Sequence, residues 1–371
     1  MTVHIMYYLR HYPSSIGLVI VLSTPIFPKD AKIHLKERNG LDSSQATKRI
    51  ISAVYSLRPH CCNIVFSRSC IMSYKYKITV FTPTYNRAYI IEKLYRSLQR
   101  QSYRDFEWLV VDDGSTDNTE TLFETWKSEN NDFPIRYFKK ENGGKVRAIN
   151  YGVDRAEGLL FFNVDSDDYL TDDALEKVAQ WEASLPKDGK FCGVVGNLGT
   201  SPTETPNTPM TVPYRDGNLL ERYSDYTDDP IDGERACVFY TEIQKKYKYP
   251  EFEGEKFVTP AVTWNRMAHD GYQVRIFDDI IWVYEYQPDG ITASVSKLFI
   301  NNPQGHGLWL REKSRFIGEP LKKRLKLYYS FYCDHKHHLT CKQIARCVAA
   351  PVSCIYLFKF IHSCAGILRR K

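Results

Sequence analysis

Five aspartates crowd into nine residues near the middle of the chain, at positions 165, 167, 168, 172 and 173. Like charges this close repel one another, so a bound cation is their natural partner. Asp165 and Asp167 stand two residues apart at an extended strand end, so their side chains project the same way and suit one cation with oxygen ligands. Asp172 or Asp173 can instead cap the following helix. A calcium loop fits less well, since Tyr169 and Leu170 replace its fifth-position ligand and sixth-position glycine. The segment therefore predicts a Mg²⁺ or Mn²⁺ site with Asp167 and Asp165 as ligands.

Three further polar clusters follow apolar segments, at Thr82–Arg87, Asp112–Asp117 and Asn142–Lys145. Asp112 and Asp113 can accept hydrogen bonds from the N–H groups of a base or the hydroxyls of a ribose. The backbone N–H groups and the ammonium of Asn142–Lys145, at the start of a helix, fit a phosphate. Taken singly, each cluster also reads as an ordinary turn or a helix cap.

The elements around these clusters alternate between strand and helix patterns. We expect strands at Ile78–Thr82, Phe106–Val111, Ile135–Phe138 and Leu159–Val164, and helices at Ala88–Arg100, Asn118–Ser128, Val146–Ala156 and Asp173–Leu185. This order predicts an α/β fold with a mostly parallel sheet covered by helices on both faces. The four clusters would then converge at the carboxyl ends of the strands, where such sheets bind ligands.

Regular patterning lapses after this region. We expect residues 186–235 to form a long irregular segment that acts as a functional loop. Ordered patterns return at 236–246, 258–269 and 272–286, and a basic helix is expected near 319–332.

Three of these motifs, in this order, resemble the donor-binding half of the family 2 glycosyltransferases. They are Pro83-Thr84-Tyr85-Asn86, Asp112-Asp113-Gly114-Ser115-Thr116-Asp117 and Asp165-Ser166-Asp167-Asp168. The resemblance is specific over residues 75–190 and looser to about 295, where 284–286 and 289–292 look like bacterial polysaccharide-biosynthesis members. It implies a GT-A fold, a nucleotide-diphosphate sugar donor, a Mg²⁺ or Mn²⁺ cofactor and inversion at the anomeric carbon.

The resemblance also implies roles for single residues. Asp112 and Asp113 would hold the nucleoside, Lys145 and Arg147 would lie near the phosphates, Asp165 would face the ribose or the metal, and Asp167 would bind the metal. The implied nucleotide-sugar-binding residues are Pro83, Tyr85, Asn86, Arg87, Asp112, Asp113, Lys145, Arg147 and Asp165.

The catalytic base is where this sequence departs from the family. The family usually supplies the base from a Glu-Asp pair, and the matching stretch here is Glu251–Phe257, with Lys256 where the Asp is expected. The base is then Glu255 or Glu253. The alternative is that these carboxylates are exposed charges on a solvated loop.

Charge is distributed unevenly along the 371 residues. The net charge of +6 is the sum of +6 over residues 1–71, −11 over 72–310 and +11 over 311–371. The composition, with 43% hydrophobic and 25% charged residues, excludes a disordered chain, and the acidic middle speaks against a protein that wraps nucleic acid. We expect a weakly ordered extension or misassigned start at 1–71. A GT-A domain would follow at 72–300, with a nucleotide-sugar half at 75–190 and an acceptor half at 191–300. A basic helical tail would occupy 301–371.

The tail contains the longest apolar stretch, Cys347–Leu368, which Pro351 interrupts and which carries Lys359 near its middle. A central lysine disfavours a spanning helix, so the stretch either lies on a membrane surface or packs on the protein body. The short apolar run 16–22 carries no clear cleavage site and does not read as a signal peptide. The ten cysteines form no disulfide framework, which favours a reduced cytosolic protein; a zinc cluster over Cys333–Cys341 is the alternative.

Together these features predict a metal-dependent inverting glycosyltransferase in cell-surface polysaccharide biosynthesis. Its partners would be a nucleotide-diphosphate sugar and a saccharide or lipid-linked saccharide, with no nucleic acid. It would be cytoplasmic, with peripheral contact at the inner face of the cell membrane. One alternative is a nucleotidyltransferase that makes sugar nucleotides, although Thr82–Arg87 lacks the glycines of its phosphate loop. The other is a catalytically impaired, membrane-associated sugar-nucleotide-binding protein.

Overall fold

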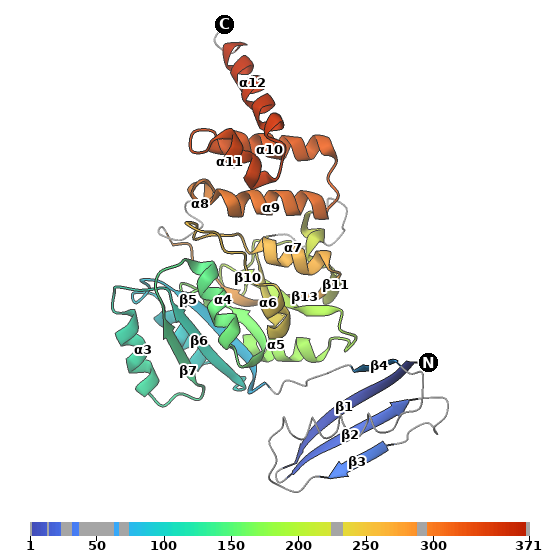
Figure 1. The fold of residues 1–371 in the computed structure, drawn as a ribbon. Coiled ribbons are helices and arrows are strands. Elements are labelled where there is room, and N and C mark those ends of the chain that lie inside the picture. The colour runs from blue at the N-terminus through green and yellow to red at the C-terminus, as the bar shows by residue number, and fades with distance from the viewer. Residues whose placement is uncertain are drawn as a thin grey trace. The chain divides into compact units, whose positions relative to one another are not determined.

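The structure, a computed structural model, describes residues 2–12, 15–23, 32–36, 63–66, 74–223, 233–287 and 295–368. The chain divides into two units, Met1–Ser73 and Tyr74–Lys371 (Figure 1). In the first unit, the backbone forms a four-stranded sheet in the order β3-β2-β1-β4, whose strands are β1 (Thr2–Tyr12), β2 (Ser15–Ser23), β3 (Lys32–Lys36) and β4 (Asn63–Phe66). That residues 1–71 are a weakly ordered extension or a misassigned start stays a prediction.

A nine-stranded, mostly parallel sheet forms the centre of the second unit, in the order β11-β13-β10-β12-β8-β5-β6-β7 with β9 paired to β13. The parallel half consists of β5 (Tyr76–Thr84), β6 (Phe106–Asp112), β7 (Ile135–Lys139) and β8 (Gly158–Asn163). The other half consists of β9 (Tyr169–Leu170), β10 (Phe191–Gly199), β11 (Tyr214–Gly217), β12 (Arg235–Tyr240) and β13 (Gln273–Val283). There β10 and β13 run parallel, while β12 is antiparallel to both β8 and β10.

Helices cover both faces of this sheet, as predicted. One face carries α2 (Glu92–Gln99), α3 (Thr119–Ser128) and α5 (Ala174–Ala183), and the other carries α4 (Lys145–Arg155), α6 (Thr241–Lys246) and α7 (Ala261–His269). Successive side chains along a strand point to opposite faces of the sheet. Val80 packs with α2 and α3, whereas its neighbour Phe81 packs with α4. Burying each such side chain contributes about 1.5–3 kcal/mol, which fixes strand register. The predicted α/β fold is confirmed.

The largest error of the sequence prediction concerns residues 186–235. This stretch contains β10, a fully buried central strand, as well as the short strand β11 and the 3₁₀ helix η1 (Leu219–Tyr223). Three glycines weaken its strand signal, yet close packing requires them. A Cβ at Gly193 would lie 2.0 Å from the carbonyl oxygen of Val238 on the adjacent strand β12. The helix expected over 88–100 is also shorter, because α2 begins at Glu92.

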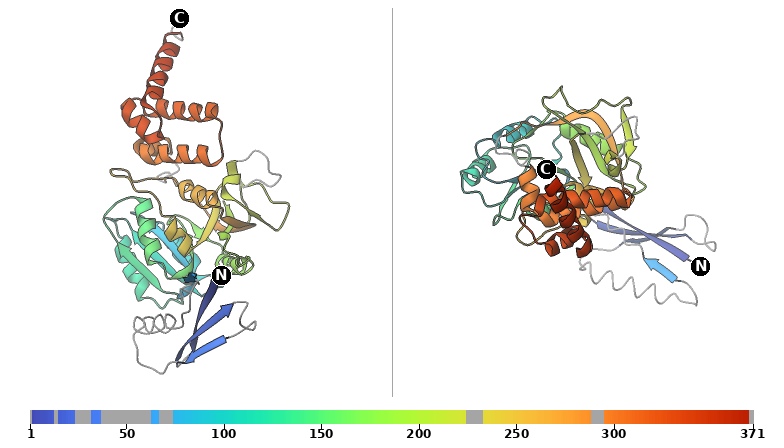
Figure 2. Two further views of the ribbon diagram at one scale, coloured as in Figure 1. Left: turned by 45° about the vertical axis from the view of Figure 1, so that its right-hand side comes forward. Right: turned by 90° about the horizontal axis from the view of Figure 1, so that it is seen from above.

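Five helices follow the sheet: α8 (Val295–Asn301), α9 (Pro303–Phe316), α10 (Leu321–His335), α11 (Cys341–Val348) and α12 (Val352–Leu368) (Figure 2). The sequence predicted only α10 and the apolar tail, not α9. The tail is broken where expected, since Ala349 adopts a left-handed conformation (φ 49°) just before Pro351. Among the described residues, no single helix is long and apolar enough to cross a membrane. Only α11 and α12 taken together pass that test, and a bend of 120° separates them.

Candidate functional site

The polar clusters after β5, β6 and β8 meet at one edge of the sheet. Thr84 is paired with Asp112 in the ladder, and the N–H of Asp113 donates to the carbonyl of Thr84 at 2.8 Å. The N–H of Val164, just after β8, donates to the carbonyl of Phe81 at 2.8 Å. The predicted convergence of the clusters at the carboxyl ends of the strands is therefore observed.

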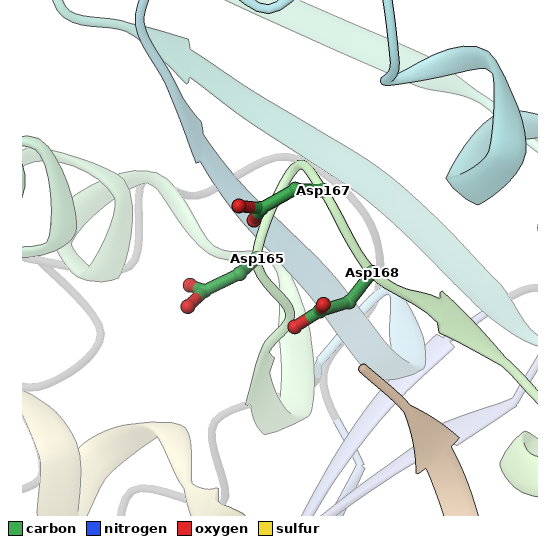
Figure 3. Close-up of side chains that lie close together, drawn as sticks. All are labelled: Asp165, Asp167 and Asp168. Atoms are coloured by element: carbon green, nitrogen blue, oxygen red, sulfur yellow. The ribbon is translucent and has the colours of Figure 1, made fainter. Parts of the chain in front are cut away.

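Three carboxylates share the turn between β8 and β9. One oxygen each from Asp165, Asp167 and Asp168 lies within 4.8 Å of the others, and the three side chains project from the same short turn (Figure 3). The Lys145 ammonium lies 2.7 Å from the Asp165 carboxylate, and the Arg87 guanidinium lies 4.0 Å from Asp167. The predicted pair Asp165 and Asp167 thus lies together, with Asp168 as a third member.

Repulsion within this cluster shifts its titration. Burial and the neighbouring Asp165 carboxylate raise the pKa of Asp167. Burial, followed by the charges of Asp165 and Asp167, raises the pKa of Asp168 to about 8, although its carboxylate accepts from the Trp282 indole at 2.8 Å and the Glu285 N–H at 3.3 Å. Burial alone would lower the pKa of Lys145, but Asp165 beside it raises that pKa. A cluster whose negative charges are disfavoured by one another fits a divalent cation with oxygen ligands.

Asp113 organises the loop before α4. Its carboxylate accepts from the Lys140 ammonium at 2.7 Å and from the N–H groups of Gly143 at 3.0 Å and Gly144 at 2.7 Å. The backbone N–H groups that the sequence offered to a phosphate are therefore used within the protein. Lys145, the first residue of α4, instead directs its ammonium to Asp165.

Asp112 is fully buried at the end of β6. Its carboxylate accepts from the Ser115 N–H at 2.7 Å and from the Tyr137 hydroxyl. Burial and this hydrogen bond raise the pKa of Tyr137. Asp112 thus stabilises the turn that carries Asp113. Tyr137 and Lys140 were not predicted as site residues, because they belong to no motif in the sequence and are recognisable only by their places in and after β7.

Asn86 joins the first turn to the second. It adopts a left-handed conformation (φ 53°), and its side-chain oxygen accepts from the Thr116 N–H at 2.8 Å while its own N–H donates to the Ser115 hydroxyl at 2.8 Å. Asparagine tolerates that conformation better than most residues. Pro83 is buried within β5, and Tyr85 exposes about half of its surface at this edge.

Part of the chain is similar to known proteins. Residues 79–247 match the family model described as glycosyl transferase family 2. Residues 79–247 form a family 2 glycosyltransferase domain. It is 35% identical over 106 residues to the GalNAc(5)-diNAcBac-PP-undecaprenol beta-1,3-glucosyltransferase of Campylobacter jejuni, covering 28% of this chain and 34% of that protein. It is 37% identical over 99 residues to the chondroitin synthase of Pasteurella multocida, covering 27% of this chain and 10% of the synthase.

These matches span about a third or less of the relatives' own length. Among solved structures, the chain is similar to S. aureus TarS 1-349 in complex with UDP-GlcNAc. That alignment has 18% sequence identity and a TM-score of 0.49, and it covers 78% of this chain and 92% of TarS 1-349.

Just beyond the matched residues of the glycosyltransferase domain, the segment Glu251–Phe257 packs on the start of α4. A Cβ at Gly144 would lie 2.3 Å from the carbonyl oxygen of Lys256, so only glycine allows this approach. Arg147 donates to the carbonyls of Phe252 and Glu255, each at 2.6 Å, and to that of Gly143 at 2.7 Å. The guanidinium expected near the phosphates thus ties the segment to α4, beside Lys145 and the acidic cluster.

The two candidates for the base of the glycosyltransferase domain lie in different surroundings. Glu255 is only 7% exposed, and its carboxylate accepts from the N–H groups of Gln304 at 2.7 Å and Gly305 at 2.9 Å. It therefore caps the first turn of α9, where a negative charge is favourable. Glu253 is exposed on the segment, and so is Lys256. The contact of Glu255 with α9 could not be predicted from the sequence, because α9 lies some fifty residues further along the chain.

Among the described residues, only Asp165, Asp167 and Asp168 form a group able to hold a metal ion. The alternative of a zinc cluster over Cys333–Cys341 therefore finds no support in that part of the chain. The described cysteines are free thiols.

Proposed function

We propose that this chain is an inverting glycosyltransferase that moves a sugar from a nucleotide-diphosphate sugar to the hydroxyl of a saccharide acceptor in cell-surface polysaccharide biosynthesis. The observation that carries the proposal is the carboxylate cluster at 165, 167 and 168, which lies at the strand ends inside a family 2 glycosyltransferase domain. The family match favours glycosyl transfer over the nucleotidyltransferase alternative.

Asp165 and Asp167 are the proposed ligands of a Mg²⁺ or Mn²⁺ ion, and the raised pKa of Asp167 supports a fit to a cation. Such an ion, when bound, supplies positive charge to the departing nucleoside diphosphate. Lys145 already lies against Asp165, and a diphosphate beside this carboxylate would have the ammonium within reach. Arg87 and Tyr85 lie at the same edge and are the further proposed donor contacts. We assign Asp112, Asp113 and Asn86 to shaping the two turns that border the nucleoside.

In a single displacement, the acceptor oxygen forms a bond to C1 of the sugar while the bond from C1 to the diphosphate oxygen breaks on the opposite face. The hydroxyl proton passes to a carboxylate. We assign this role to Glu253, whose side chain is exposed, because both oxygens of Glu255 already accept N–H groups of α9. Glu255 and Arg147 then act as positioning residues that hold the segment 251–257 beside the acidic cluster.

The acceptor class rests on a relative. The name of the Campylobacter protein describes an undecaprenol-linked saccharide, and we propose a lipid-linked saccharide as the acceptor here. Such an acceptor would bring the enzyme to the inner face of the cell membrane. In this proposal, residues 72–300 form the GT-A domain with a donor half at 75–190 and an acceptor half at 191–300, and residues 301–371 form the membrane-side tail.

Release of nucleoside diphosphate from a panel of UDP-, GDP- and dTDP-sugars tests the proposal. We expect one donor to be turned over with Mn²⁺, and D167A to lower that turnover by about a thousandfold, or ~4 kcal/mol. D172N is the matched control, because Asp172 belongs to the same run of aspartates but pairs with Arg100 at the surface. Equal turnover by folded D167A and D172N would refute the cation role.

The base assignment is tested by E253Q and E255Q. We expect E253Q to lose transfer while it retains donor binding. In E255Q the amide oxygen can still accept one N–H of α9, so this variant should keep measurable transfer. Full activity in both variants would remove the segment from the mechanism.

A further inference from the structure

Helix α12 presents an apolar face that the rest of the chain does not cover. Tyr356, Leu357, Phe360 and Ile361 are 52%, 55%, 66% and 46% exposed. Spaced at i, i+1, i+4 and i+5, they form one continuous stripe on the helix. Such a cluster of large exposed apolar side chains is typical of an interaction surface.

The opposite face of α12 is held by the protein. Ile355 and Phe358 are buried, and the Phe358 ring lies 5.5 Å from that of Tyr329 on α10. Helix α12 contacts both α10 and α11, and two views show it projecting from that pair (Figures 1 and 2). Its orientation is thus fixed by packing, and the exposed stripe is the face turned away from α10.

The sequence charge of this end of the chain indicates the kind of partner. From position 335 to the end, the sequence contains no Asp or Glu and seven Lys or Arg residues. Lys359 is exposed beside the stripe on α12. An apolar face in cationic surroundings matches an anionic lipid surface, which offers acyl chains and negative headgroups together. A second copy of this chain would instead bring a second Lys359 and the same positively charged sequence to the contact.

The length and packing of α12 favour a helix that lies in the interface. Its 17 residues extend about 25 Å, short of the ~30 Å hydrocarbon core, and Lys359 stands near its middle. A spanning helix would also have to withdraw Ile355 and Phe358 from their contacts with the protein. The geometry points to the Tyr356, Leu357, Phe360 and Ile361 face of α12 as a docking surface that inserts shallowly into an anionic bilayer. This surface is distinct from the donor site and is testable without any donor.

Co-sedimentation of the full chain with phosphatidylglycerol-containing vesicles, against pure phosphatidylcholine vesicles, tests the inference. We expect binding to the anionic vesicles that weakens between 0.1 and 0.5 M salt, and a loss of about fivefold or more in L357S/F360S. V212S is the matched control, because Val212 is also exposed, at 42%, but lies in the sheet domain. Thermal unfolding followed by circular dichroism checks that the three proteins fold alike.

Three results would overturn the inference. The first is equal vesicle binding by the wild type and L357S/F360S, and the second is no binding of anionic vesicles by the wild type. The third is a wild-type dimer in sedimentation equilibrium that L357S/F360S converts to a monomer without any vesicle binding, which would assign the face to a second copy. Because the assay contains no sugar nucleotide, failure here leaves the proposed transferase activity intact, and the reverse also holds.

Discussion

The sheet edge and the C-terminal helices differ in the sign of their charge. At the edge, Asp165, Asp167 and Asp168 concentrate negative charge that burial makes unfavourable. In the C-terminal region, the Lys and Arg residues of 335–371 are opposed by no Asp or Glu, and α12 exposes an apolar stripe. The first arrangement suits a small cation with a phosphate-bearing ligand, and the second suits an extended anionic surface. The net charge of +6 therefore describes neither region.

The segment Glu251–Phe257 is one of the connections between the two regions, beside the packing of α7 on α9. Arg147 and Gly144 hold residues 251–257 against α4, and Glu255 of that segment caps α9. The side chain of Asn302, just before α9, accepts from the N–H groups of Lys256 and Phe257 at 2.8 and 3.0 Å. The donor edge and the helical region thus share a hydrogen-bonded connection, and variants on either side can separate their contributions.

The largest expected effect is on cation binding at the edge. With free Mn²⁺ a thousandfold above its Kd, the wild-type free energy of unfolding should rise by about 4 kcal/mol, as scored by thermal unfolding. D167A should lose most of this gain, whereas D172N should keep it. Because the pKa of Asp167 is raised by folding, its ionised form destabilises the metal-free protein at pH 8, so D167A without cation should melt no lower than the wild type. A full Mn²⁺ effect in D167A would contradict the assignment.

The next largest effect is a dependence of the free energy of unfolding on pH, caused by two histidines in the C-terminal helices. The Nδ1 atom of His306 on α9 lies 3.2 Å from the Nε2 atom of His335 on α10. Burial, followed by His335, lowers the pKa of His306 to about 4, and burial, followed by His338, lowers that of His335 to about 4. The folded state thus binds fewer protons than the unfolded state between pH 6.5 and 4. The contribution of this histidine pair to the free energy of unfolding should therefore fall by roughly 2–3 kcal/mol as the pH drops over that window, and it should stay flat above it.

Denaturant titrations at pH 7, 6, 5 and 4.5 measure this slope. H306Q/H335Q should flatten it, while H337Q at an exposed histidine should not. An unchanged slope in the double variant would place the acid sensitivity elsewhere.

A smaller effect is expected at the connection. R147A should remove the guanidinium that donates hydrogen bonds to the carbonyls of Phe252 and Glu255. Sugar transfer should fall about tenfold, with a larger change in kcat than in the KM for the sugar nucleotide. R155A on the same helix serves as the control and should stay within about twofold. Steady-state kinetics over a range of donor concentrations give kcat and the donor KM separately for both variants. A pure rise in donor KM for R147A would instead support the phosphate contact expected from the sequence.

The smallest effect tests whether the regions are separable. Thr340 caps α11 in a reciprocal pair with Gln343, so T340A should cost about 1 kcal/mol of stability. Donor turnover should not change at 25 °C. T125A, at an exposed position of α3, should alter neither quantity. A loss of turnover in T340A that matches its stability loss would argue that the helices and the edge act as one unit.

The sequence predicted the parts whose signal is local. Short apolar runs predicted β5, β6 and β8, and the rule that parallel sheets bind ligands at the carboxyl ends of their strands then placed Asp112, Asp113 and Asp165 at one edge. The strand β10 was not predicted, because Gly193 and Gly196 have low strand propensity. Glycine is needed at these positions for close packing against β12 and the Ile281 side chain.

Pairings between distant residues could not be predicted. Asp113 binds the N–H groups of Gly143 and Gly144 some thirty residues away, and Glu255 binds those of Gln304 and Gly305 about fifty residues away. Motif spacing identifies which carboxylates lie near the site. Only tertiary structure distinguishes those that the protein uses for its own loops from those that remain available for a ligand.

The most direct test of the two-region account is Mn²⁺-dependent release of nucleoside diphosphate from the accepted sugar nucleotide, without vesicles, by the wild type, D167A and L357S/F360S. We predict that turnover by D167A falls by about a thousandfold, or ~4 kcal/mol in activation free energy, while turnover by L357S/F360S stays within about twofold of the wild type. Retention of turnover in folded D167A, or an equal loss in both variants, would contradict it.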